Sequence, residues 1–196
     1  LKAALLAIEE SFRSTGIAVP IMASFTVFEG GRTLSAQTVD ACYQSISHAN
    51  LLSAGINCAL GPEKLRPYLA DLSRICPRMV SCYPNAGLPN ALGGFDETPE
   101  MMASVIGEFA RDGFLNIVGG CCGTTPDHIR AIADEVSLHP PRRSPDQPRL
   151  SRYSGLELLE VRPESSFTIV GERTNVTGSK AFARLIKEEN YEAALS

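Results

Sequence analysis

FLNIVGGCCGTTPDHIR, residues 114–130, sets the pattern for the whole chain. Its first five residues, 114–118, form an apolar run of the length expected for a fully buried strand. Two glycines end this run, and Cys121 and Cys122 follow directly. A helix is predicted to begin after Thr125, because threonine caps helices and proline suits the next position. The two cysteines therefore lie where a strand passes into a loop, which is the active-site end of a parallel β/α protein.

The same unit of a short apolar strand and an amphipathic helix recurs earlier in the chain. The strands are predicted near residues 17–25, 56–60 and 79–83. The helical pattern after the first strand covers residues 35–54. This alternation predicts an α/β protein with a parallel sheet, and its spacing fits the second half of a (β/α)₈ TIM barrel. A doubly wound sheet fits too, but no G-x-G-x-x-G follows any strand, which argues against its dinucleotide-binding form.

The composition is that of an ordinary globular protein. Of its 196 residues 44% are hydrophobic and 20% charged, and the net charge of −4 predicts no binding to nucleic acid or to an anionic membrane surface. No apolar run is long enough to span a membrane, and no secretory signal opens the chain, so we expect a cytoplasmic protein with reduced thiols. Because the chain starts with Leu1 inside a helical pattern and stops without a capping signal, we interpret it as a fragment of a longer protein.

Three segments differ in character. Residues 1–138 carry the repeated strand–helix units, and residues 139–153 are rich in proline and arginine, which predicts an extended linker. Residues 154–196 contain a further strand at 166–170 and a helix at 180–194. We interpret this last segment as the first βα unit of a second TIM barrel.

Three cysteines are predicted to converge. Cys58 lies at the end of the second strand of the pattern, and strand ends of a parallel sheet meet at one edge, so Cys58 can reach Cys121 and Cys122. Three thiolates at such an edge are typical of a zinc site. No fourth ligand stands at a suitable spacing, since His128 is expected to face away, and this favours a catalytic site with an open position. The residues leave two other interpretations of the vicinal pair, which are buried small side chains and a strained disulfide.

The remaining cysteines are not expected to bind metal. One lies within a helical pattern, one in a loop before a strand and one inside a strand, where packing explains a thiol well. These are Cys42, Cys76 and Cys82.

Several long motifs resemble one family. INCALGP, YPNAGLPN, FLNIVGGCCGTTPDHI and, after the proline-rich segment, GERTNVTGS are similar, in the same order, to those of the cobalamin-dependent methionine synthases. The first three lie in the homocysteine-binding barrel of that family and the last at the start of its methyltetrahydrofolate-binding barrel. The resemblance implies that Cys58, Cys121 and Cys122 bind Zn²⁺ and that the sulfur of homocysteine becomes the fourth ligand.

The resemblance also implies partners and further site residues. The methyl group would come from methylcobalamin, held by a cobalamin-binding domain of the same parent chain, and methylcobalamin would be regenerated from 5-methyltetrahydrofolate. Asn85 directly follows a strand, where its amide can hold the carboxylate or ammonium of homocysteine, although a tight turn would also explain it. Asn175 is expected in the folate site, because an amide suits the edge of a pterin ring.

Two rival functions remain. A methyltransferase of the same barrel class could use another donor, such as betaine or S-methylmethionine, but GERTNVTGS argues against it because those enzymes lack a folate barrel. A non-catalytic module with a structural zinc ion is the rival from another class. Because half of the first barrel and most of the second are missing, we do not expect this chain alone to turn over.

Overall fold

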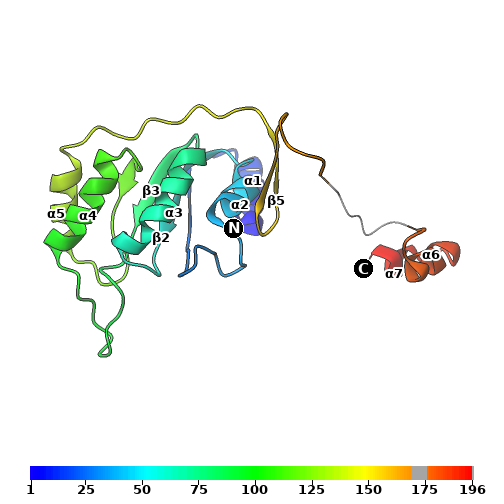
Figure 1. Cartoon of the computed structure of the whole chain (residues 1–196), viewed down its shortest axis with the longest axis horizontal. Helices are drawn as coiled ribbons and strands as arrows, with labels where there is room; N and C mark the ends of the chain where they lie inside the picture. Colours follow the sequence, from blue (N-terminus) through cyan, green and yellow to red (C-terminus); the bar gives the residue numbers. More distant parts are fainter. Residues whose placement is uncertain (169–175, 196) are drawn as a thin grey trace. The chain divides into compact units, whose positions relative to one another are not determined.

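The computed structural model describes residues 1–168 and 176–195 of the chain (Figure 1). These residues form two compact units, Leu1–Val161 and Arg162–Ser196. The first unit holds the sheet and all three candidate zinc ligands. The predicted division into residues 1–138, 139–153 and 154–196 stays a prediction.

The first unit is built on a parallel sheet of four strands. The strands lie side by side in the order in which they occur along the chain. They are β1 (Ile21–Phe25), β2 (Leu51–Asn57), β3 (Met79–Tyr83) and β4 (Ile117–Val118). Every neighbouring pair is parallel. The α/β class and the parallel sheet are thus confirmed, while the closed barrel stays a prediction.

Five helices accompany the sheet. They are α1 (Lys2–Thr15), α2 (Val39–Ile46), α3 (Pro62–Ile75), α4 (Pro99–Arg111) and α5 (Pro126–Val136). Helix α5 begins as predicted, at Thr125-Pro126, where a threonine caps the helix and a proline fills its first position. Helix α4 begins in the same way, at Thr98-Pro99.

The core lies between the helices and one face of the sheet. Side chains alternate along a strand, so Ile56 of β2 and Cys82 of β3 point into this core while their neighbours point to the other face. Apolar residues of α2 to α5, such as Leu69 and Ile106, fill the helix side of the same core. Because the four strands are parallel, their carboxyl ends lie at one edge of the sheet, where the loops carry the cysteines.

One predicted boundary is wrong. The helical pattern of residues 35–54 forms only the short helix α2, which ends at Ile46, and Leu51 already begins strand β2. Leu51 pairs with Ile21 of β1 and is buried beside Ala49. The spacing of apolar residues near residue 50 fits a helix or a strand, and the pairing of these residues with β1 favours the strand.

The proline-rich segment is packed onto the first unit. It runs from α5 across to a hairpin of β5 (Ser151–Ser154) and β6 (Leu158–Val161), and this hairpin contacts α2 (Figure 1). Arg142 is only 5% exposed, and its guanidinium donates to the backbone carbonyls of Ser73 (2.7 Å), Cys76 and Arg78 (3.0 Å). Because the carbonyls at a helix end lack partners within the helix, Arg142 caps the carboxyl end of α3. The composition of the segment did not predict this.

The second unit contains two short helices, α6 (Lys180–Lys187) and α7 (Tyr191–Leu195). The hydroxyl of Ser179 accepts a hydrogen bond from the Phe182 amide at 3.2 Å and so caps α6. The prediction of one helix over 180–194 is wrong, because Glu189 adopts a left-handed conformation (φ 52°) that ends α6. The predicted strand at 166–170 lies partly outside the described residues, and its first three residues form no strand.

No helix among the described residues is both long and apolar enough to cross a lipid bilayer.

Candidate metal centre

The three predicted zinc ligands come together just beyond the carboxyl ends of β2 and β4. Cys58 directly follows β2, and Cys121 and Cys122 lie in the loop between β4 and α5. Cys58 and Ala59 adopt left-handed backbone conformations, with φ of 62° and 60°. Such conformations are strained for residues other than glycine and occur mostly at functional sites. The chain is therefore bent sharply at the point where it presents the first thiol.

The segment after β3 joins the two cysteine loops. On one side, the amide of Cys58 donates to the Tyr83 carbonyl at 2.9 Å. On the other side, the Cys121 amide donates to the carbonyl of Pro84 at 2.8 Å, and the Ala86 amide donates to that of Cys122 at 2.9 Å. Residues 83–86 thus hold the three thiols in place through backbone hydrogen bonds, which need no particular side chain.

The spacing of the sulfur atoms fits a zinc ion. The Sγ atoms of Cys58 and Cys122 are 3.5 Å apart, and those of Cys121 and Cys122 are 3.9 Å apart. All three lie within 4.8 Å of one another. A tetrahedral zinc with Zn–S bonds of about 2.3 Å places its sulfur ligands about 3.8 Å apart. The three cysteines therefore form a group that can hold zinc with little rearrangement, and they are free thiols rather than a vicinal disulfide.

The three thiols influence one another's ionisation. Burial, together with hydrogen bonds to Cys58 and Cys122, raises the pKa of Cys121 to about 11. Burial also tends to raise the pKa of Cys58. The net effect is a lowered pKa, because the thiol forms hydrogen bonds with the Ala59 backbone, the two other cysteines and Asn85. The first negative charge is thus stabilised on Cys58. A metal cation would favour the thiolate form of all three.

Asn85 lies between the cysteine loops. It is 4% exposed, and its side-chain carbonyl accepts a hydrogen bond from the Cys122 amide at 3.1 Å. Its backbone amide donates to the Leu60 carbonyl in the loop after Cys58, at 3.2 Å. The structure therefore places Asn85 beside the thiols, where it holds the loop of Cys122, and its contact with substrate stays a prediction.

His128 is occupied elsewhere. Its Nδ1 lies 2.8 Å from the Thr125 hydroxyl and accepts from the Thr125 amide at 3.2 Å. Its Nε2 therefore carries the proton and donates to the Glu97 carbonyl at 2.9 Å. These bonds close the first turn of α5 and attach it to the loop before α4, so both ring nitrogens serve to position the loop that carries Cys121 and Cys122.

The other predicted positions follow from the fold. The remaining three cysteines are buried in the core and belong to no metal-binding group among residues 1–168 and 176–195. They are Cys42, Cys76 and Cys82. Asn175 lies outside the described residues.

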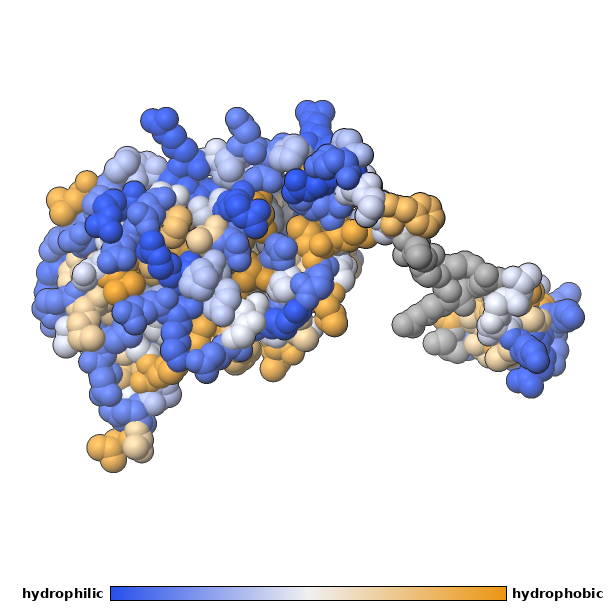
Figure 2. Space-filling view, viewed as in Figure 1, coloured by the Kyte–Doolittle hydropathy of each residue, from blue (hydrophilic) through white to orange (hydrophobic). Residues whose placement is uncertain are grey.

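A projecting loop borders the metal centre. After Asn85 the chain leaves the body of the first unit and returns at Glu97, where the Glu97 amide donates to the Ala86 carbonyl at 3.2 Å (Figure 1). Apolar side chains lie at the tip of this projection (Figure 2), where Leu92 is 96% exposed. At the base, the ring of Phe95 covers Gly123, whose φ of 80° and lack of a Cβ atom allow this contact beside Cys122.

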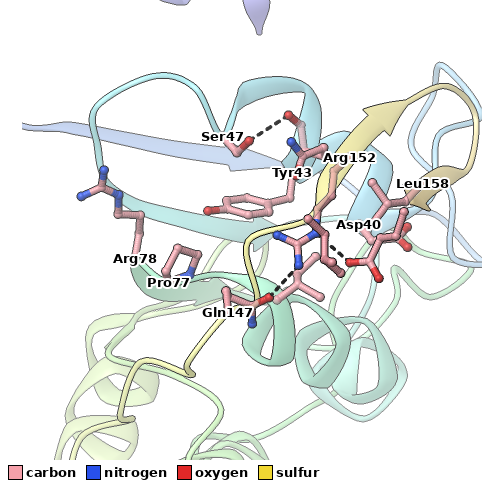
Figure 3. Close-up of a pocket in the computed structure, with 12 residues that line it drawn as sticks. Asp40, Tyr43, Ser47, Pro77, Arg78, Gln147, Arg152 and Leu158 are labelled. Atoms are coloured by element: carbon pink, nitrogen blue, oxygen red, sulfur yellow. Dashed lines mark hydrogen bonds and ion pairs between the residues drawn. The ribbon is translucent and has the colours of Figure 1, made fainter. Parts of the chain in front are cut away.

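A hollow at the opposite end of the sheet is unrelated to the thiols. This cavity of about 610 Å³ lies between the end of α2, the segment before β3 and the β5–β6 hairpin (Figure 3). Tyr43 and Arg78 line it, and Arg152 reaches across to Gln147 at 3.3 Å. Because it lies near the amino end of β3, it cannot share a ligand with the three cysteines.

Comparison with known families agrees with this geometry. The model of the family described as homocysteine S-methyltransferase matches residues 1–136, which include the sheet and all three cysteines. The chain belongs to that family. Homocysteine S-methyltransferases transfer a methyl group to a thiol and bind homocysteine as substrate, and a site of three cysteines suits that chemistry.

Proposed function

We propose that the protein is part of a cobalamin-dependent methionine synthase, which methylates homocysteine to methionine. The observation that carries the proposal is the group of three thiols, Cys58, Cys121 and Cys122, at the carboxyl edge of the sheet in a homocysteine S-methyltransferase domain. These three side chains would hold Zn²⁺ and leave its fourth position to the substrate. When bound, zinc keeps the substrate sulfur in the thiolate form at neutral pH without oxidising it.

The chain's own groups orient the reacting sulfur. Residues 83–86 and the α5 turn closed by His128 fix the loops that carry the cysteines, so that the substrate meets a preformed site. The homocysteine thiol loses its proton to solvent before reaction. Its sulfur then attacks the methyl carbon of the donor, and the S–C bond forms as the bond between carbon and donor breaks. The electron pair of the broken bond stays with the donor.

We propose methylcobalamin as the methyl donor, held by a cobalamin-binding domain of the parent chain and regenerated from 5-methyltetrahydrofolate. Support comes from the motif GERTNVTGS at residues 171–179, which resembles the start of a folate-binding barrel and follows the packed proline-rich segment. A homocysteine methyltransferase that uses betaine or S-methylmethionine has no need of such a segment. We extend the proposal to a complete (β/α)₈ barrel, of which the four parallel strands would form half.

Metal analysis tests the assignment of the ligands. Replacement of any one ligand by alanine should abolish stoichiometric zinc binding, since two thiolates alone hold zinc poorly. The matched controls are alanine variants of the three core cysteines, Cys42, Cys76 and Cys82, which should keep one zinc per chain. Full zinc content in a variant that lacks Cys58, Cys121 or Cys122 would contradict the assignment.

Sulfur-edge X-ray absorption with added homocysteine separates an enzyme from a structural zinc module. A catalytic site gains a fourth sulfur ligand, whereas a closed structural site does not change. Asn85 is the proposed contact for the amino-acid part of homocysteine, because it lies beside the thiols. With zinc held at saturation, unchanged homocysteine affinity in Asn85→Ala would remove Asn85 from the substrate site.

Asn175 is the proposed contact to the pterin ring. In the full-length parent enzyme, Asn175→Ala should weaken binding of methyltetrahydrofolate and slow methyl transfer to cobalamin, while homocysteine binding stays intact. An unchanged dissociation constant together with unchanged transfer would refute this role.

A further inference from the structure

The face of the sheet opposite the helices is polar. Residues that pair in register point to the same face, so Ser24 of β1, Gly55 of β2 and Ser81 of β3 lie in one row on this face. The Ser81 hydroxyl occupies the place that a Cβ of Gly55 would take, at 1.9 Å. A polar row of this kind needs polar partners, because it does not face the apolar core formed with the helices.

The last row before the cysteines consists of Asn57 and Tyr83. They are register partners at the carboxyl ends of β2 and β3. Asn57 directly precedes Cys58, so their Cα atoms are about 3.8 Å apart. The backbone carbonyl of Tyr83 accepts from the Cys58 amide at 2.9 Å. Both side chains therefore start next to the first thiol of the metal centre.

Contacts orient both side chains on this face. The Ser24 hydroxyl donates to the side-chain carbonyl of Asn57 at 2.6 Å, so the Asn57 amide nitrogen is left to donate elsewhere. The ring of Tyr83 lies against Gly119, where a Cβ atom would come within 2.9 Å of the ring. Ser24 and Asn57 also line an open hollow of about 1040 Å³. The Asn57 side chain thus has the space to meet a small molecule.

Two other polar side chains beside the thiols hold the cysteine loops. Asn85 accepts from the Cys122 amide at 3.1 Å, and the Thr124 hydroxyl donates to the Cys121 carbonyl at 2.7 Å. By contrast, over residues 1–168 and 176–195 neither the Asn57 amide nitrogen nor the Tyr83 hydroxyl forms a hydrogen bond. Two hydrogen-bond donors of the row that precedes Cys58 are therefore free among these residues.

We propose that the Asn57 amide and the Tyr83 hydroxyl bind the carboxylate of the thiol substrate, an inference that rests on the proposed function. A metal-bound homocysteine sulfur is separated from its carboxylate by a short aliphatic chain, so the carboxylate has to lie close to the cysteines. A carboxylate accepts hydrogen bonds only, and both side chains offer donors toward the same face. Asn57 and Tyr83 thereby select amino-acid thiols over thiols without a carboxylate.

A comparison of two thiols tests the inference. The probes are homocysteine and 1-propanethiol, which shares the sulfur and the alkyl chain but has neither the carboxylate nor the ammonium group. The protein is loaded with Co²⁺, because its sulfur-to-metal absorption increases when a further thiolate binds. Asn57→Ala and Tyr83→Phe should each weaken homocysteine binding about tenfold or more, the range for a hydrogen bond to a charged group. Binding of 1-propanethiol should not change.

Two further variants make the result decisive. Asn57→Asp keeps the size of the side chain and places a negative charge against the carboxylate, so it should weaken homocysteine binding more than Asn57→Ala and again spare 1-propanethiol. Asn50→Ala, at the exposed position just before β2, is the control and should bind both thiols like the wild type.

Each alternative outcome has a distinct meaning. Unchanged homocysteine affinity in the Asn57 and Tyr83 variants would overturn the inference, as would an equal loss for both thiols, which would indicate damage to the metal site. Equal affinity of the wild type for both thiols would also overturn it and leave the proposed function standing. These measurements use the full-length parent enzyme, and if its wild type binds neither thiol, the proposed function itself fails, and the inference with it.

Discussion

Replacing Asn85 by alanine should weaken zinc binding without unfolding the protein. The substitution removes the acceptor of the Cys122 amide, which is 3.1 Å away, and this amide belongs to a ligand residue. Because Asn85 is 4% exposed, water cannot easily replace the lost oxygen atom. A buried donor without a partner costs about 1–3 kcal/mol. Since the zinc-bound loop must keep the Cys122 amide in place, the zinc dissociation constant should rise about 5- to 150-fold.

Competition with a chromophoric chelator measures that constant, and circular dichroism checks the fold. Asn90→Ala is the matched control, because Asn90 lies in the same loop but bonds Asp96 and Gly94 and not a cysteine. It should leave the zinc constant within about a factor of two, as expected for an exposed position. An unchanged constant in Asn85→Ala, or an equal loss in Asn90→Ala, would refute the reasoning that one side-chain oxygen holds the loop.

Two further predictions concern stability and thiol reactivity. Arg142→Ala should lower the free energy of unfolding, measured in urea, by at least about 2 kcal/mol, because several carbonyls at the end of α3 lose their donor. Arg143→Ala, at the exposed neighbouring position, should change it by less than about 0.5 kcal/mol. Similar values for both variants would contradict the capping role. In the zinc-free protein at pH 8, iodoacetamide should modify Cys58, whose pKa is lowered, long before Cys82, whose pKa burial raises to about 12. Peptide mass mapping gives the order of reaction, and early labelling of Cys82 would show that the core opens readily.

Short-range patterns predicted the sheet and the meeting of the thiols. Glycine breaks and Thr-Pro caps mark where strands end and helices begin, and parallel strands must bring Cys58 to Cys121 and Cys122. The same patterns failed near Leu51, where pairing with β1 and not local periodicity decides the element. Local propensity is a weak guide at such a boundary.

Arg142 and Asn85 show a second limit of the sequence. A single buried arginine in a segment rich in proline and arginine has no periodic signal, and its partners at the end of α3 lie far away in the chain. Asn85 was predicted at the site as a substrate contact, but its bond to the Cys122 amide depends on how two loops meet. Specific polar contacts between segments that lie far apart in the chain follow from the three-dimensional structure and not from sequence patterns.

The burial of Arg142 bears on how the protein can be divided. A cut at residue 138, where the repeated strand–helix pattern stops, looks harmless on composition but removes the donor that closes α3. The same cut removes the β5–β6 hairpin, whose Ser154 hydroxyl donates to the Ala41 carbonyl of α2 at 2.7 Å. A truncated form of the protein should therefore extend to Val161 in order to fold as an intact first unit. In limited proteolysis, the backbone around Arg142 should resist cleavage although prolines and arginines surround it.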